Sequence, residues 1–302
     1  MSTLVLVFIA IVPAVVLGLY VYSKDRVEKE PIGLLLKFFA FGALSCIPAA
    51  IVEGILNLVI NLFFSEETIR IYEEKLTGQY NVSVYIYSMA ACFIGIALVE
   101  EAGKFWVLDK ISRKTPELNS LFDGLIYAVF VSLGFAALEN ILYVLENGLE
   151  VGIMRAVLSV PAHMFFGVIM GCSYSMWRIK LKASEFENIL KAAGYIPPHA
   201  SAFNCRKEKL MCILLPVMAH GFYDFCCLMG TVSAVLMLIV FVVFLYIYCF
   251  RKIRSMSRLD TYNYNYAMKL IDEKYPGGAQ LVYTIMYQQN IYNYTENSCS
   301  NV

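Results

Sequence analysis

The chain has 302 residues, of which 59% are hydrophobic and 16% are charged; an average soluble domain is about 45–50% apolar and about 25% charged. Its 24 Lys and Arg side chains balance 24 Asp and Glu side chains, so the formal net charge is zero. This composition excludes a nucleic-acid-binding protein, which needs a basic excess, and a disordered chain, which needs low hydrophobicity and high net charge. The bilayer is therefore the expected solvent.

Several stretches of the sequence are apolar over about 20 residues or more, the length that a transmembrane helix needs. They are residues 3–22, 33–64, 83–108, 121–146, 154–178, 209–229 and 231–250. The sequence thus predicts an all-α protein, a polytopic transmembrane bundle of about seven helices. The last two stretches are separated only by a short turn near Gly230, which predicts a tight helical hairpin.

Basic residues gather in alternate loops between these stretches. The loops after the first, third, fifth and seventh stretches carry clusters of Lys and Arg, whereas the loops after the second and fourth carry mostly Glu. Because basic loops stay on the cytoplasmic side, the N-terminus is expected outside and the C-terminus in the cytoplasm.

The apolar stretches also divide the chain. Residues 1–250 hold all of them and are predicted to form one transmembrane domain that carries the chemistry. Residues 251–302 are rich in Tyr and Asn and are predicted to form a cytoplasmic polar tail that is dispensable for the chemistry.

Ionisable residues lie within the predicted helices, where each costs about 2.5–3.5 kcal/mol on insertion scales. Glu100 and Glu101 lie four and three residues before Lys104, so both carboxylates can reach the ammonium group. Two carboxylates beside one cation suit acid–base chemistry. The alternative is a salt bridge that snorkels to the cytoplasmic surface.

The fourth and fifth stretches add more buried polar residues. Glu139 is followed by Asn140, and Arg155 is a natural structural partner for the Glu139 carboxylate. His163 lies four residues before the first glycine of Gly167-x-x-x-Gly171, a spacing typical of close helix packing. A histidine on such a face is either a packed core residue or a ligand.

The sixth stretch carries a histidine and an aspartate. His220 and Asp224 are four residues apart, so on a helix the carboxylate can orient the imidazole and fix its tautomer. A purely structural His–Asp pair is the alternative.

Polar residues on four predicted helices are best explained by one shared site, because four separate burials would each be costly. A Glu can act there as a general base towards water, and His, Asn or Lys can stabilise an oxyanion. Substrates that reach such a site through the bilayer are membrane proteins, which indicates an intramembrane protease. The sequence has no His-Glu-x-x-His and no Gly-x-Ser-Gly motif, so zincin and rhomboid-like serine sites are unsupported.

A metal is not required by this interpretation, and no cofactor is predicted. A zinc ion held by Glu101, His163 and His220 is the alternative, because these are legitimate zinc ligands.

Several motifs follow one another in order along residues 1–250. They are Tyr22-Ser-Lys-Asp25 with Glu30-Pro31, Glu100-Glu101-x-x-Lys104, Phe122-Asp123-Gly124, Leu133 to Tyr143 around Glu139-Asn140, Arg155, Pro161-x-His163 to Gly171, and His220-Gly-x-Tyr-Asp-Phe225. In this order they resemble the PrsW family of bacterial membrane proteases.

The resemblance implies an intramembrane endopeptidase in the bacterial cytoplasmic (inner) membrane. Its expected partner is a single-pass membrane protein, an anti-sigma factor, in which it makes the first cut and so releases an extracytoplasmic-function sigma factor in a stress response. The resemblance implies that Glu100, Glu101 and His220 are catalytic. The residues expected to support them are Lys104, Glu139, Asn140, Arg155, His163 and Asp224.

The PrsW family is similar in turn to the CAAX prenyl proteases and related immunity proteins. Glu139 stands here where that wider group has His, and Asp224 where it has Asn. A CAAX-like prenyl protease and a non-catalytic scaffold or immunity protein of the same fold are therefore alternatives. A transporter with Glu53, Glu139 and Arg155 on an ion path predicts inverted repeats, which we do not find in the sequence.

Helix geometry also predicts the depth of these residues. At 1.5 Å per residue, Glu101 and His220 lie roughly 10 and 15 Å from the cytoplasmic ends of their helices. Glu139 and His163 lie roughly 27 and 22 Å from the same side. The sequence therefore predicts two polar layers, a catalytic one and a deeper one.

Overall fold

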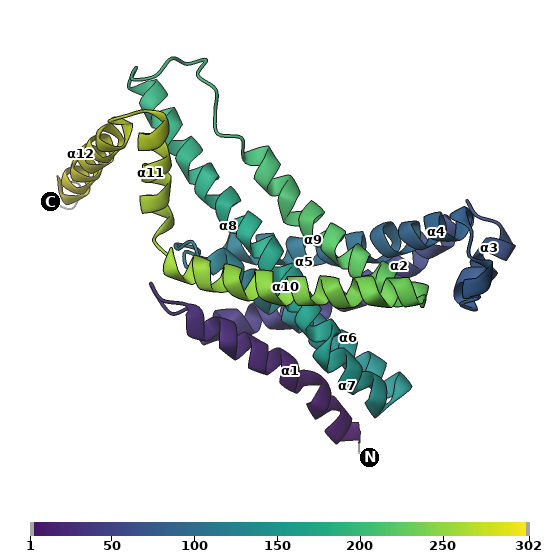
Figure 1. The fold of residues 1–302 in the computed structure, drawn as a ribbon. Helices are drawn as coiled ribbons and strands as arrows, with labels where there is room; N and C mark the ends of the chain where they lie inside the picture. Colours follow the sequence, from purple (N-terminus) through teal and green to yellow (C-terminus); the bar gives the residue numbers. More distant parts are fainter. Residues whose placement is uncertain (1–2, 300–302) are drawn as a thin grey trace.

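The computed structural model describes residues 3–299, and the side chains of residues 6–288. Within that part of the chain it is an all-helical bundle with seven helices long and apolar enough to cross a membrane, which confirms the predicted class and number (Figure 1). These helices are α1 (Thr3–Lys24), α2 (Ile32–Asn61), α4–η2–α5 (Val82–Ser112), α6 (Asp123–Asn147), α7–α8 (Leu149–Ala192), α9 (Cys205–Met229) and α10 (Val232–Arg258). Short helices α3 (Glu66–Glu73) and η1 (Thr77–Gln79) lie between α2 and α4.

Helix α6 is the central helix of the bundle and packs against α8, α2 and α1. Its backbone touches that of α2, because a Cβ atom on Gly134 would lie 2.0 Å from the carbonyl oxygen of Phe39. A Cβ atom on Gly42 would likewise lie 2.2 Å from the carbonyl oxygen of Val131. Only glycine allows two helices to approach this closely.

The fifth spanning helix is broken and much longer than predicted. The sequence predicts residues 154–178, whereas α7 (Leu149–Val157) ends before Leu158 and α8 (Ser159–Ala192) then runs on to residue 192. Pro161 lies in the first turn of α8, where its missing N–H group costs no helical hydrogen bond. The extension escaped prediction because it is amphipathic rather than apolar, so a search for membrane spans does not detect it.

The extension of α8 is covered by the C-terminal segment. Helix α11 (Asn263–Lys274) packs against α8, and α12 (Gly278–Cys299) lies beside them at the same end of the molecule (Figure 1). The fully buried Glu187 carboxylate accepts hydrogen bonds from Lys274 Nζ (2.6 Å) and the Tyr275 hydroxyl (3.0 Å). Helix α10 continues through residue 250 to Arg258. The division at residue 250 into a transmembrane domain and a dispensable tail remains a prediction.

Four acidic side chains lie near one another at the end of the bundle that is expected to face the cytoplasm. Asp25 and Glu30 are buried between α1 and α2, and the Tyr127 hydroxyl donates to Glu30 Oε2. Asp123 accepts backbone N–H groups of the loop before α6, and Asp260 accepts that of Phe122. Burial raises the pKa of Asp25 to about 6 and that of Glu30 to about 9.

The raised pKa of Glu30 predicts that stability falls with rising pH. Between its ordinary value of 4.5 and about 9, the folded protein keeps a proton on Glu30 that the unfolded chain releases. Unfolding is therefore favoured as the pH rises through this window. In detergent, Glu30→Gln is expected to raise the midpoint of thermal unfolding at pH 9 relative to wild type, with little gain at pH 5. The exposed neighbour Glu28→Gln is the matched control, and a wild-type midpoint that increases from pH 5 to pH 9 would contradict the prediction.

Candidate active site

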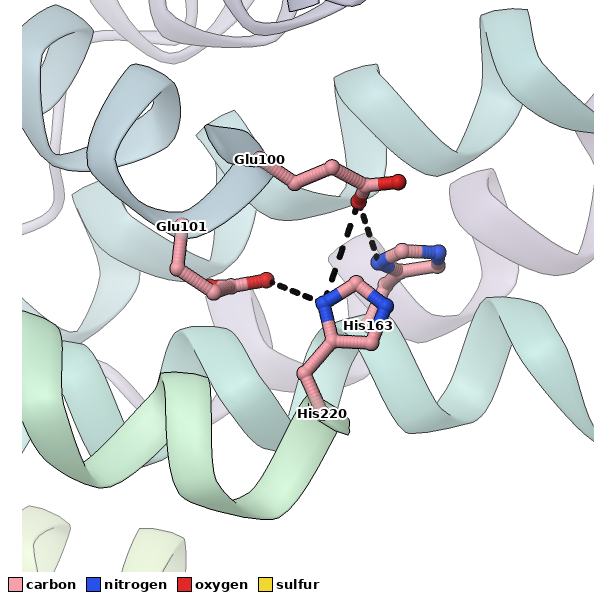
Figure 2. Close-up of side chains that lie close together, drawn as sticks. All are labelled: Glu100, Glu101, His163 and His220. Carbon is pink, nitrogen blue, oxygen red and sulfur yellow. Dashed lines mark hydrogen bonds and ion pairs between the residues drawn. The ribbon is translucent and has the colours of Figure 1, made fainter. Parts of the chain in front are cut away.

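Four buried side chains from three helices meet in the middle of the bundle. Glu100 and Glu101 come from α5, His163 from α8 and His220 from α9 (Figure 2). One oxygen or nitrogen atom of each lies within 4.8 Å of those of the other three. The tertiary structure therefore brings together all three residues predicted to be catalytic, and His163 with them.

The helix that carries the two glutamates is irregular just before them. Residues Ala90–Ala97 (η2) form a π-helix, with a wider turn than the α-helical segments on either side. Such segments are rare and often mark functional sites. The ring of Phe93 in η2 packs against Gly221, where a Cβ atom would lie 2.5 Å from the ring. Glycine next to His220 therefore lets α9 approach η2 closely.

Lys104 lies within the four-residue cluster. Its Nζ atom donates to Glu101 Oε1 at 2.7 Å and to Glu100 Oε2 at 3.0 Å, as the spacing of the three residues predicts. It also lies 3.0 Å from His163 Nδ1 and 4.2 Å from the centre of the Phe135 ring. The side chain is 0% exposed, which rules out the snorkelling alternative.

His163 joins two groups of polar residues. Because a lysine ammonium only donates, His163 Nδ1 accepts from Lys104, and its Nε2–H donates to Glu139 Oε2 at 2.9 Å. Glu139 Oε2 also pairs with Arg155 at 2.8 Å, as expected from the sequence. The two predicted polar layers are thus one continuous network, because the His163 ring spans the distance between them.

His220 is held in a similar way. Its Nδ1 atom lies 3.0 Å from Glu101 Oε1, and its Nε2 atom lies 3.3 Å from Asp224 Oδ2. The Phe166 ring stacks on the imidazole with 4.7 Å between centroids. The predicted pairing of His220 with Asp224 is therefore present, and the stacked ring fixes the imidazole plane.

Asn140 is the one expected supporting residue that lies away from this network. Its Nδ2 atom donates to the carbonyl oxygen of Ala10 in α1 at 3.1 Å, and the residue is fully buried. Successive residues on a helix point about 100° apart, so Asn140 faces α1 whereas Glu139 faces His163.

A cavity of about 330 Å³ adjoins the cluster. Its charged and polar lining residues are Glu53, Glu100, Glu139, Tyr143, Arg155, Ser159, His163, His220, Tyr223, Asp224 and Cys227. Glu101 and Lys104 are absent from the lining. Tyr143, Ser159 and Tyr223 are not among the site residues predicted from the sequence, although Tyr143 lies four residues after Glu139 and so shares its helix face.

The cluster fits a metal ion by its chemistry. Two carboxylates and two imidazoles are typical zinc ligands, and Glu101 Oε2 is buried without a hydrogen-bond partner. Both rings direct Nδ1 at the cluster, while their Nε2 atoms are backed by the carboxylates of Glu139 and Asp224. Metal-binding histidines commonly have such a carboxylate behind them. The geometry adds Glu100 to Glu101, His163 and His220, the zinc ligands that the sequence offers as an alternative to a metal-free site.

Comparisons with known proteins identify the family of the chain. Residues 30–249 match the family model of the PrsW family intramembrane metalloproteases. The curated Protease PrsW of Oceanobacillus iheyensis is 33% identical over 238 residues, which cover 78% of this chain and 89% of the relative. That of Clostridioides difficile is 31% identical over 246 residues, covering 80% of this chain and 87% of the relative.

The Protease PrsW of Bacillus subtilis is more distant. It is 28% identical over 246 residues, which cover 81% of this chain and 92% of the relative. No solved structure matches the chain. With seven apolar helices around a buried Glu–His cluster and a family match over most of its length, this chain belongs to the PrsW family of intramembrane proteases.

Proposed function

We propose that this multi-pass membrane protease makes the first cut in a single-pass anti-sigma factor and so starts a stress response in the bacterial inner membrane. The observation that carries the proposal is the buried Glu–His cluster beside a cavity of about 330 Å³. A peptide segment reaching this cavity would meet carboxylates and imidazoles at one point, which is what hydrolysis of an amide bond requires.

Glu100 is the general base in this proposal. It lines the cavity, whereas Glu101 is fully buried and does not line it. Both carboxylates contact Lys104, but only Glu101 is also hydrogen-bonded to His220. The Glu100 carboxylate accepts a proton from water as the water attacks the scissile carbonyl, and later gives it to the leaving amine. Glu101 has a positioning role, because it holds both the lysine and the imidazole.

Other side chains can stabilise the negative charge that develops on the oxygen of the scissile carbonyl. His220 lines the cavity and is oriented by Asp224 and the stacked Phe166 ring, so its Nδ1–H can move from Glu101 Oε1 to the oxyanion of the tetrahedral intermediate. A metal ion bound by Glu101, His163 and His220 would polarise the substrate carbonyl as a Lewis acid and leave Glu100 free to act as the base.

The position of the cavity supports a cut in the outer part of the substrate. Its lining includes Tyr143 near the end of α6, Met154 and Leu158 at the break between α7 and α8, and Leu228 at the end of α9. The charge pattern of the loops predicts that these helix ends face the outside. A substrate that enters the cavity from the outside would be cut in its outer part, as the first cut in an anti-sigma factor requires.

Co-expression with single-pass anti-sigma factors of the same organism, tagged at both ends, tests the proposal. We expect the wild type to give two fragments with a cut at the outer part of the substrate helix, and Glu100→Ala/Glu101→Ala to leave the substrate whole. A scaffold of the same fold predicts that both proteins bind the substrate and neither cuts it. Cleavage by the double variant would refute the proposed site.

A further inference from the structure

Lys104 contacts three of the four residues that could bind a metal ion. The four ligand atoms of the cluster come from Glu100, Glu101, His163 and His220. Lys104 Nζ lies within 3.0 Å of one oxygen or nitrogen atom of each of the first three, namely Glu100 Oε2, Glu101 Oε1 and His163 Nδ1. An ammonium group has three N–H donors, so these three acceptors use all of them.

Because of the contact with His163, Lys104 and a metal ion cannot both bind this histidine at the same time. An imidazole nitrogen has one lone pair in the ring plane, and His163 Nδ1 offers it to Lys104. The opposite nitrogen, Nε2, is directed at Glu139 and is not free to replace it. A metal ion bound to Nδ1 needs the same lone pair, so His163 cannot serve Lys104 and a metal ion together.

The charge balance of the cluster also disfavours binding of Lys104 and a metal ion together. Lys104 is 0% exposed and lies between two buried carboxylates, so its charge offsets theirs in a place where unpaired charge is costly. A divalent ion would neutralise the same two carboxylates by itself. With both cations in the cluster, the positive charge would exceed the negative charge of Glu100 and Glu101.

We propose that Lys104 is an internal cation that competes with a divalent metal ion for the Glu100–Glu101–His163–His220 cluster. Metal binding then requires the Lys104 side chain to withdraw from His163, and Lys104 sets the metal affinity of the protein. This role concerns binding alone and holds whatever substrate the protease cleaves.

Zinc binding to full-length protein in detergent tests the proposal, measured by competition with a chelator and by elemental analysis. Lys104→Met keeps the length of the side chain and removes the donor groups. If the ammonium holds the cluster for more than about nine-tenths of the time, its removal lowers the apparent Kd by at least about tenfold. Lys180→Met is the matched control, because Lys180 pairs with Glu208 away from the cluster, and its affinity should equal that of wild type.

Loss of Lys104 leaves two buried carboxylates without their cation, so the variant is purified with zinc present. A second variant, Glu100→Gln/Lys104→Met, removes one of these charges and keeps three ligands, the number found in many zinc enzymes. We expect zinc to raise the thermal unfolding midpoint of Lys104→Met by more than that of wild type, and that of the double variant by more than that of Glu100→Gln. Zinc binding by folded Lys104→Met that is equal to or weaker than that of wild type would overturn the proposal. If the single variant does not fold, binding by the double variant that is equal to or weaker than that of Glu100→Gln would do so.

Discussion

Glu100→Gln is expected to slow substrate cleavage by about 10²–10⁴-fold, the usual contribution of a general base. Glutamine keeps the size of the side chain and can still accept from Lys104 through its amide oxygen, but it cannot take a proton from water. The assay is the initial rate of fragment formation from a tagged single-pass substrate in proteoliposomes.

The matched control for this change is Glu187→Gln. Glu187 is as fully buried as Glu101, but it lies in the extension of α8 and pairs with Lys274. The Glu187→Gln substitution is expected to lower thermal stability and to leave the cleavage rate within a few-fold of wild type. A Glu100→Gln protein that folds and cleaves at the wild-type rate would remove Glu100 from the mechanism.

His163→Gln is expected to lower cleavage by more than about 100-fold, beyond the 10- to 100-fold typical of residues behind a metal ligand. The imidazole contacts Lys104 with one nitrogen and Glu139 with the other, and it also lines the cavity. The amide of glutamine cannot reproduce both contacts at opposite ends of a rigid ring. The same proteoliposome assay measures the loss, together with the zinc content of the purified protein.

His199 provides the control for this second change. It lies exposed in the loop between α8 and α9, so His199→Gln is expected to behave as wild type in both measurements. The sequence by itself ranks His163 below His220, as a supporting residue. Retention of more than about half of the wild-type rate by His163→Gln would restore that ranking, whereas equal losses for the two histidines favour the symmetric arrangement of the cluster.

Much of the fold could be predicted from the sequence because the bilayer imposes a simple rule. Seven apolar stretches became seven spanning helices, with ends that shifted by a few residues in most cases. The rule fails where a helix leaves the membrane. The extension of α8 repeats apolar residues at helical spacing (Ile179, Ala183, Phe186 and Leu190), and its buried face is covered by α11 rather than by lipid.

Within the site, the sequence determined the contacts that lie on one helix. Lys104 reaches Glu100 and Glu101, and His220 reaches Asp224, because residues three or four apart face the same side of a helix. The order of the motifs added the family, and with it the expectation that Glu100, Glu101 and His220 act together.

Only the tertiary structure decided the contacts between helices. It turned Glu139 towards His163 and its neighbour Asn140 towards α1, and it opened Glu100 but not Glu101 to the cavity. These outcomes depend on how each helix is rotated about its axis and how closely it approaches its neighbours, which glycine contacts such as that of Gly134 with α2 control. Sequence spacing fixes which residues share a helix face, but packing fixes what that face meets.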